Sequence, residues 1–330
     1  MEIKKKIILR PVGGLCNRLR ALDSFFEICK KYNFDLEVLW TTDVTLNSTF
    51  DSLFDPISFN DIKVTIINCP DGFPERNLMK IGKSSTGDFA IDLNKNSNPV
   101  KNYIKKLITT KNLSLEHRKI LAEIKKLGFN AVIRNENLDK VYLQNSSLET
   151  NIRVLDQNFI DRITPIISDA VNNSNKLYIN CCYRVAELKS NYDYLRPIDS
   201  IGNKINSISK NFGENMIGLH VRRTDHVASK AISSNDKFKK VVDAEIENNA
   251  DVKFYLSTDD PVFKDDFIKA YPNKIITNDV NSYDRNNSLA IQDAVVDLFC
   301  LSKTNKIYGS HQSSFSQTAA DIGGKKEIIV

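Results

Sequence analysis

Long apolar runs are missing from this 330-residue sequence. No stretch approaches the roughly 20 apolar residues that a membrane-spanning helix requires. The first ten residues carry three lysines followed by only three consecutive apolar residues, which is too short for the core of a signal peptide. These absences favour a cytoplasmic protein, and they leave open a peripheral contact with the inner face of the membrane.

Paired cysteines are also lacking. None of the six cysteines belongs to a CxxC pair, and the one close pair is the adjacent Cys181 and Cys182. This pattern argues against a structural zinc site and against the disulfide framework of a small secreted protein. Reduced and mostly buried thiols are expected, and no bound metal is predicted.

Glycine and proline are few, at 12 and 9 residues, which excludes collagen-like and low-complexity chains. Charge of one sign is scarce as well, because 46 Lys and Arg against 41 Asp and Glu leave a net charge of +5. Proteins that bind nucleic acids usually carry denser basic clusters with aromatic residues between them, so no nucleic-acid partner is predicted. A small positive excess suits an anionic small molecule or a membrane surface.

Short apolar runs alternate with helix-period patterns along the chain, which is typical of βαβ units and parallel sheets. Strands are expected at 7–10, 36–40, 64–67, 177–183, 216–221, 252–257, 274–277, 306–308 and 327–330. Helices are expected at 15–29, 113–126, 235–248, 261–271, 288–303 and 314–322, and a long polar loop at 71–100. The length predicts two domains. A loop rich in tyrosine and asparagine before Pro197 places their boundary between residues 195 and 196.

The first candidate site is the glycine-rich turn between the first expected strand and the helix after it. Gly13 and Gly14 allow a tight turn, and the free N–H groups of a helix start attract anions. Asn17 adds an amide and Arg18 a positive charge. The motif is neither a dinucleotide-binding fingerprint nor a Walker loop, and a plain turn with a surface arginine is the alternative.

The second candidate site follows the strand at 216–221. In an open α/β sheet the carboxyl ends of the strands face the ligand crevice. Strand alternation places His220 and Arg222 on one face, and an arginine can grip a phosphate with two hydrogen bonds. Arg223 adds a second guanidinium. A structural ion pair between an arginine and Asp225 is the alternative, although it leaves the histidine unexplained.

Aspartates mark two further positions. Asp259 follows the strand at 252–257, where a helix cap before Pro261 is the favoured interpretation and a substrate contact the alternative. Asp293 and Asp297 are four residues apart on a helix that is apolar nearly all round and is therefore expected to be buried. A buried carboxylate needs donors, which guanine, a ribose hydroxyl or a structural arginine would supply. Asp297 is the favoured ligand contact.

Small hydroxyls begin the helix at 314–322. Ser313 and Ser314, followed by Phe315, combine hydroxyl groups with the unpaired N–H groups of a helix start, which together form a phosphate seat. A simple serine cap is the alternative. Cationic and hydroxyl groups at strand ends that share one crevice predict an anionic nucleotide ligand.

Four segments together resemble the fucosyltransferase superfamily of α1,6-, nodulation and protein O-fucosyltransferases: GGLCNRLRAL, GLHVRRTDHV, FYLSTDDP and, after NNSL, the run VVDLFCLSKTNKIYGSHQSSFSQTAA. The resemblance covers residues 7–22 and 217–320, and the segment 41–195 matches nothing. It implies a bacterial member with a GT-B fold, in which two Rossmann-like domains face each other across a cleft. Residues 1–195 would form the acceptor side, and residues 196–330 would bind the GDP-sugar donor.

The implied activity is an inverting, metal-independent transfer of fucose from GDP-fucose to an oligosaccharide or lipid-linked glycan, without a cofactor. The resemblance also gives roles to seven residues: His220 near the nucleotide, Arg222 and Arg223 on the pyrophosphate, Asp297 on the nucleoside, Ser314 and Phe315 near phosphate and sugar, and Asn17 near the reacting centre. Donor contacts are further expected from Gly13, Gly14, Arg18, Asp259 and Ser313.

One departure from the family pattern concerns the general base. The α1,6 enzymes carry a glutamate ten residues after the motif histidine, where this sequence has Lys230. Asp225 is the nearest carboxylate in the sequence and the candidate base, although it can also serve only to orient Arg222. Two alternatives therefore stay open, a transferase for another GDP-linked deoxyhexose or heptose and an inactive nucleotide-sugar-binding protein. A dinucleotide oxidoreductase is disfavoured, because no GxGxxG motif precedes an acidic residue by about 20 positions.

Overall fold

The computed structural model of the chain describes residues 5–59, 61–69, 131–133, 157–173, 175–187, 189–223, 232–280, 282–284 and 286–330. The loop predicted at 71–100 and the helix predicted at 113–126 lie outside these residues. Asp225 and Lys230 lie outside them as well.

The N-terminal half is built on a five-stranded parallel sheet with the strand order β3-β2-β1-β5-β4. Its elements are β1 (Lys6–Pro11), α1 (Leu15–Tyr32), β2 (Asp35–Thr41), β3 (Val64–Cys69), β4 (Ala131–Ile133), α6 (Gln157–Asn172) and β5 (Lys176–Cys181). The middle of β1 is the apolar run Ile7, Ile8 and Leu9, and all three side chains are buried. Such a run is typical of a strand at the centre of a parallel sheet, where helices cover both faces.

The C-terminal half has a second five-stranded parallel sheet, with the order β10-β9-β6-β7-β8. Its elements are α7 (Asp199–Ser209), β6 (Met216–Val221), α9 (Asn235–Asn248), β7 (Lys253–Thr258), α10 (Pro261–Ala270), β8 (Ile275–Thr277), α11 (Ser288–Ser302), β9 (Lys306–Gly309), α12 (Ser314–Gly323) and β10 (Glu327–Ile329). The two parallel sheets confirm the predicted α/β class. Every predicted strand is present, with its ends shifted by at most two residues.

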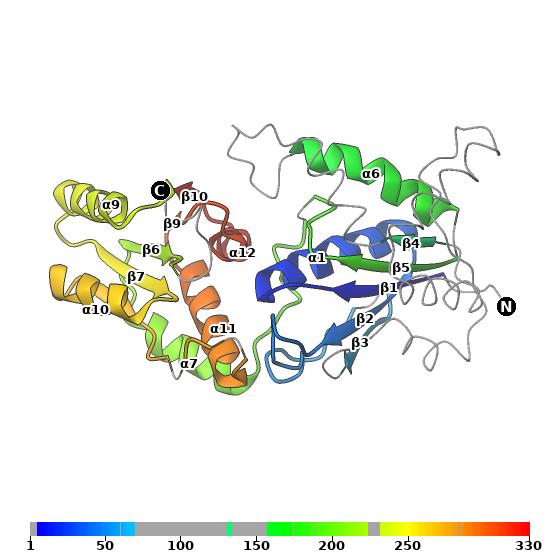
Figure 1. Cartoon of the computed structure of the whole chain (residues 1–330), viewed down its shortest axis with the longest axis horizontal. Coiled ribbons are helices and arrows are strands. Elements are labelled where there is room, and N and C mark those ends of the chain that lie inside the picture. Colours follow the sequence, from blue (N-terminus) through cyan, green and yellow to red (C-terminus); the bar gives the residue numbers. More distant parts are fainter. Residues whose placement is uncertain are drawn as a thin grey trace.

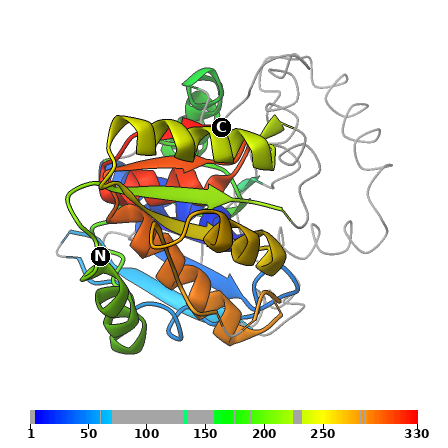
Figure 2. The same cartoon turned by 90° about the vertical axis from the view of Figure 1, so that its left-hand side faces the viewer.

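The helices of the C-terminal half form two layers. Helices α9 and α10 cover the outer face of the second sheet, whereas α11 and α12 lie on the face toward the N-terminal half (Figure 1); the first two are nearest to the viewer in Figure 2. The alternation of β6 explains the two layers, because Leu219 and Val221 pack against the α9 and α10 side. His220, between them in the sequence, stacks on Phe315 of α12 on the opposite face.

The two halves share one apolar interior. A continuous cluster of buried apolar side chains extends from the first sheet into α11 and α12. The rings of Phe54, from the N-terminal half, and Phe299, from α11, have centroids 6.5 Å apart. Helix α11 is thus buried on two sides, which explains its almost uniformly apolar sequence. The predicted boundary between residues 195 and 196 falls in the connection from β5 to α7 and stays a prediction.

Side-chain caps fix the start of two helices that follow strands. The carboxylate of Asp260 accepts hydrogen bonds from the N–H groups of Val262 and Phe263, and Pro261 occupies the first helical position. The hydroxyl of Ser313 accepts from the N–H of Phe315 at 3.3 Å at the start of α12. None of the described helices is both long enough and apolar enough to cross a membrane.

Candidate functional site

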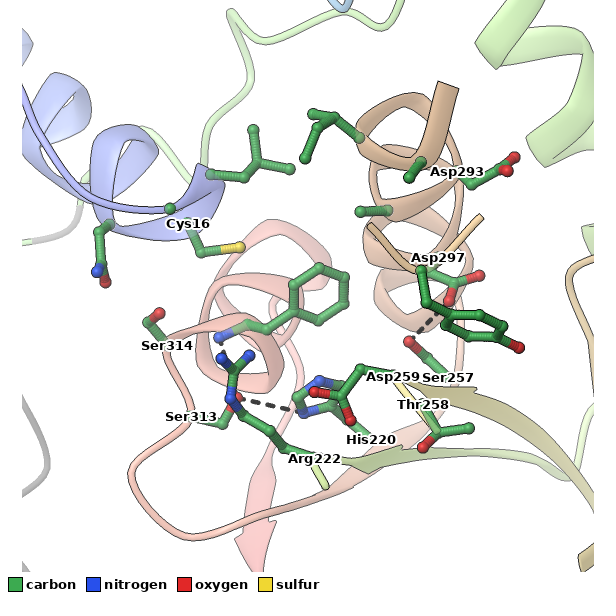
Figure 3. Close-up of a pocket in the computed structure, with 18 of the residues that line it drawn as sticks. Cys16, His220, Arg222, Ser257, Thr258, Asp259, Asp293, Asp297, Ser313 and Ser314 are labelled. Carbon is green, nitrogen blue, oxygen red and sulfur yellow. Dashed lines mark hydrogen bonds between the residues drawn. The ribbon is translucent and has the colours of Figure 1, made fainter. Parts of the chain in front are cut away.

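A cavity of about 360 Å³ lies where the carboxyl ends of strands from both sheets approach each other. The N-terminal half lines it with Gly14, Leu15, Cys16, Asn17, Arg20 and Thr45. The C-terminal half contributes residues after β6, β7 and β9 and from α11 and the loop before it. They are His220, Arg222, Ser257, Thr258, Asp259, Val280, Ser282, Tyr283, Ala290, Ile291, Asp293, Ala294, Asp297, Gln312, Ser313, Ser314 and Phe315. Figure 3 shows Cys16 of α1 across from the strand-end residues of the C-terminal half.

The glycine-rich turn positions the start of α1. Gly13 has a φ of +85°, and a Cβ atom there would lie 3.0 Å from the Asn17 amide nitrogen, so a side chain at this position would be both strained and crowded. Gly14 and Asn17 line the cavity, as the candidate-site interpretation requires, and Gly13 shapes the turn without lining it.

Arg18 does not line the cavity, which corrects its predicted role in donor binding. Its side chain is fully buried, and it donates hydrogen bonds to the carbonyl oxygens of Gly13, at 2.7 Å, and Thr41. Its guanidinium also pairs with the Asp43 carboxylate at 2.8 Å. Arg18 therefore ties the start of α1 to the end of β2, so it is neither a ligand contact nor the surface arginine of the alternative interpretation.

Arg20 is a cavity residue that the sequence argument missed. It lies one helical turn after Asn17, and residues three apart on a helix lie on the same side. Its position three residues after Asn17 is the sequence signal that could have identified Arg20. The neighbouring Cys16 also lines the cavity, and burial raises the pKa of its thiol to about 12.

His220 and Arg222 occupy alternate positions at the end of β6, and both line the cavity. The His220 ring stacks on Phe315 with centroids 4.8 Å apart, and its Nδ1 lies 3.3 Å from the Ser313 hydroxyl. Burial, helped by the charge of Arg222, lowers the pKa of His220 far below its usual value, so the imidazole is neutral at pH 7. Figure 3 shows the Arg222 side chain extending from the end of β6 in the direction of Ser314 and Cys16.

Arg223 points to the other side of the sheet, which corrects the prediction that both arginines hold the pyrophosphate. Its guanidinium lies over the rings of Phe238 and Phe263, at 5.7 and 5.4 Å from their centroids, and donates to the Ser233 carbonyl at 2.7 Å. Its backbone N–H donates to the Asp259 carboxylate at 2.6 Å. Arg223 therefore belongs to the packing between β6 and the outer helices. Asp225 lies outside the described residues.

The carboxylate of Asp297 lies at the end of the cavity away from Arg222. It is buried and accepts hydrogen bonds from the hydroxyls of Tyr255, at 2.7 Å, and Ser257, at 2.8 Å. Figure 3 shows the bond to Ser257. Burial raises its pKa to about 6, although both hydroxyls act to lower it. The side chain of Asn278 also acts to lower this pKa, and these three donors leave part of the acceptor capacity of the carboxylate for a ligand.

Asp293, the less favoured ligand contact, also lines the cavity, one turn earlier on α11. Its carboxylate accepts from the Lys204 ammonium at 2.6 Å, so a lysine rather than an arginine provides the structural partner. Among the described residues, no group of three or more His, Cys, Asp or Glu side chains is placed to hold a metal ion.

The arrangement suits a ligand that is anionic at one end and carries hydrogen-bond donors at the other. Arg222 and the free N–H groups at the start of α12 supply positive charge near Ser314. Asp297 supplies a carboxylate acceptor deeper in the C-terminal half. Ser313, Phe315 and Asp259 also line this space, and their contact with a donor stays a prediction.

Solved structures with similar backbones identify the fold. The crystal structure of the α1,6-fucosyltransferase NodZ soaked with GDP-fucose has a TM-score of 0.56 and 14% sequence identity, with 97% of this chain and 92% of that chain covered. NodZ from Bradyrhizobium has a TM-score of 0.55 and 13% identity, with 96% and 92% covered. A mutant of FUT1 from Arabidopsis thaliana in complex with GDP has a TM-score of 0.52 and 13% identity, with 99% of this chain and 70% of that chain covered.

The chain has the fold of these fucosyltransferases. The predicted GT-B fold, with two Rossmann-like units facing each other, is thereby confirmed. No protein-family model matches the chain, and no curated protein matches it.

Proposed function

We propose that the protein is a glycosyltransferase that moves fucose from GDP-fucose to a hydroxyl group of a glycan. The observation that carries the proposal is the cavity itself, with a cationic end at Arg222 and a buried carboxylate at Asp297, in a fold shared with fucosyltransferases. The similar structures include one soaked with GDP-fucose and one in complex with GDP, which supports a GDP-sugar as donor.

The two ends of the cavity match the two ends of the donor. The N1–H and N2–H₂ groups of guanine form a pair of donors that a carboxylate accepts, and we assign them to Asp297. The diphosphate then extends toward Arg222 and the start of α12, where charge-assisted hydrogen bonds are short and strong. Ser313 and Ser314 lie in this part of the cavity, with Phe315 packed on His220 beside them.

The transfer breaks the bond between the anomeric carbon and the β-phosphate oxygen, and GDP leaves with the electron pair. The acceptor oxygen attacks from the opposite face, which inverts the anomeric centre. Arg222 stabilises the charge that develops on the leaving diphosphate, a role worth about 10²–10³ in rate for one well-placed group. We assign the task of orienting the acceptor hydroxyl to Asn17, across the cavity from Arg222.

The acceptor proton passes to a general base, which we assign to Asp225. An Asp225→Asn variant is expected to lose at least about tenfold in transfer rate at unchanged GDP affinity. The arginine charge takes the place that a divalent ion holds in metal-dependent transferases, so we propose a metal-independent reaction. Full activity in EDTA is the expected result, and loss that added Mg²⁺ or Mn²⁺ restores contradicts it.

The deciding experiment offers GDP-fucose to the protein on an array of oligosaccharide and lipid-linked glycans, with the linkage of the product determined by NMR. Parallel reactions contain other GDP-linked deoxyhexoses and heptoses. Transfer of fucose supports the proposal, and transfer from another GDP-sugar alone replaces fucose as the donor. Binding of GDP-fucose with neither transfer nor hydrolysis makes the protein a nucleotide-sugar-binding protein instead.

The proposal includes a location on the cytoplasmic side, with or without peripheral contact to the inner face of the membrane. Cell fractionation tests it. Recovery of the protein from the culture medium is the contrary result.

A further inference from the structure

Arg20 is a buried cation in the cavity wall without a carboxylate partner among the described residues. Its side chain is 5% exposed. Its Nε donates to the Cys182 carbonyl at 2.7 Å, and its guanidinium lies 5.9 Å from the centroid of the Tyr183 ring. Its Nη1 is buried and has no hydrogen-bond partner in the described part of the chain.

Among the described residues of the N-terminal half, the two other buried arginines are balanced by acids. Arg18 pairs with Asp43 at 2.8 Å, and Arg184 pairs with Asp23 at 2.6 Å. Removing a guanidinium from water is costly unless an opposite charge compensates it, and a carbonyl oxygen compensates it only in part. Arg20 therefore differs from Arg18 and Arg184 in having no acid beside it among the described residues, and an anionic ligand would supply the missing charge.

The position of Arg20 indicates where that anion lies. It lines the cavity one turn after Asn17, on the side of α1 that faces the C-terminal half. Burial raises the pKa of the Cys16 thiol to about 12, while Thr318, Arg20 and Arg222 act to lower it. Arg20 and Arg222, which come from opposite halves, thus both lie near the same thiol in the cavity wall.

We propose that Arg20 is a second diphosphate ligand, so that the diphosphate of the bound nucleotide is held between Arg20 of α1 and Arg222 after β6. This inference rests on the proposed function, because it takes the nucleotide diphosphate as the anion. It adds a contact from the half that otherwise faces the acceptor. It also makes the diphosphate a bridge that holds the two halves together while the sugar is transferred.

The test compares GDP with guanosine, which lacks the diphosphate. Calorimetric titration of each ligand is carried out on the wild type, Arg20→Gln, Arg20→Lys and the control Arg196→Gln, whose side chain is exposed and outside the cavity lining. We expect Arg20→Gln to bind GDP about 10- to 100-fold more weakly and guanosine with unchanged affinity, the size expected for charge-assisted hydrogen bonds. Arg20→Lys keeps the charge without the planar guanidinium, so its affinity for GDP should lie between those of the wild type and Arg20→Gln.

A double-mutant comparison tests the bridge. Arg20→Gln and Arg222→Gln, combined, should weaken GDP binding by less than the product of their separate effects, because the first loss already loosens the diphosphate. Fully independent effects of the two substitutions would contradict the bridge.

The outcomes separate this inference from the proposed function. Failure of the wild type to bind either ligand contradicts the proposed function. Normal GDP binding by a folded Arg20→Gln overturns the role of Arg20 and leaves the function standing. An equal loss of GDP and guanosine affinity, or failure of both Arg20 variants to fold, assigns Arg20 to the structure and also overturns the inference.

Discussion

Each half of the molecule carries two arginines close together in the segment that follows a central strand. In the N-terminal half they are Arg18 and Arg20 on α1, and in the C-terminal half they are Arg222 and Arg223 after β6. One member of each pair, Arg18 or Arg223, is held by contacts within the protein. The other lines the cavity.

Backbone geometry decides which member is which. Residues two apart on a helix point in different directions, so Arg18 turns toward Asp43 while Arg20 faces the cavity. Adjacent residues in an extended chain point to opposite faces, so Arg223 reaches Phe238 while Arg222 stays on the side of His220. A doubled arginine in a sequence therefore does not imply a doubled charge at a site.

The largest expected effect is that of replacing Arg222, the arginine of the C-terminal pair that lines the cavity. Arg222→Ala should lower the transfer rate by about 10²–10³-fold, because the charge on the leaving diphosphate loses its main partner. The fold should be intact, with a circular dichroism spectrum and melting temperature close to the wild type. Initial rates of fucose transfer measure the effect.

The exposed Arg196 provides the control for that variant, since Arg196→Ala should transfer at the wild-type rate. Near-normal transfer by Arg222→Ala would refute the role of this arginine as the leaving-group ligand.

The structural member of the first pair should act on stability rather than on binding. Arg18→Met removes a fully buried guanidinium and leaves the Asp43 carboxylate, which is 24% exposed, without its partner. Loss of one member of a buried ion pair typically costs about 3–5 kcal/mol, and the partial exposure of Asp43 favours the lower end. Urea denaturation measures the free energy of unfolding. Unchanged stability combined with lost GDP binding would reverse the assignments of Arg18 and Arg20.

The pH dependence of guanosine binding tests the carboxylate at the other end of the cavity. Burial raises the pKa of Asp297 to about 6, and only the ionised form accepts from both the N1–H and the N2–H₂ of guanine. Affinity for guanosine should be constant above pH 7 and fall toward about tenfold per pH unit below pH 6. Guanosine is chosen because it carries no phosphate that titrates in this range.

Ionisation of Asp297 should lower the stability of the unliganded protein, although it favours guanosine binding. Its pKa is higher in the folded chain than in the unfolded chain, so its contribution to stability is present at low pH and is lost as the pH rises through about 6. Asp297→Asn should bind guanosine weakly at every pH and lose both dependences. If the affinity of the wild type for guanosine does not depend on pH, Asp297 is not the residue that binds guanine.

The smallest expected effect belongs to Arg223. Arg223→Met should lower the free energy of unfolding by about 1–2 kcal/mol, because it loses the hydrogen bond to Ser233 and two cation–π contacts while keeping most of its packing volume. Thermal unfolding measures it. A loss of transfer rate as large as that of Arg222→Ala would show that the two arginines act together after all.

Sequence periodicity located strands better than it located helices outside the βαβ pattern. Helix α7 was missed because it contains Gly202 and several Asn and Ser residues, which are poor helix formers. It is held by Ile201 and Ile205, which join the apolar cluster that includes α11. Helix α6 was missed as well, and it contains Pro165 in its interior. The three-residue strand β4 is too short to show a period.

The amino-acid sequence by itself determined the alternation of strands and helices and the polar residues at the strand ends, because apolar period and helix caps are local properties. It also brought out Asn17, Arg222 and Asp297 as candidates. Only the tertiary structure decided which arginines enter the cavity and that α1 faces the end of β6. The direction of a side chain depends on the twist of its own element and on the packing of segments that lie far apart in the chain.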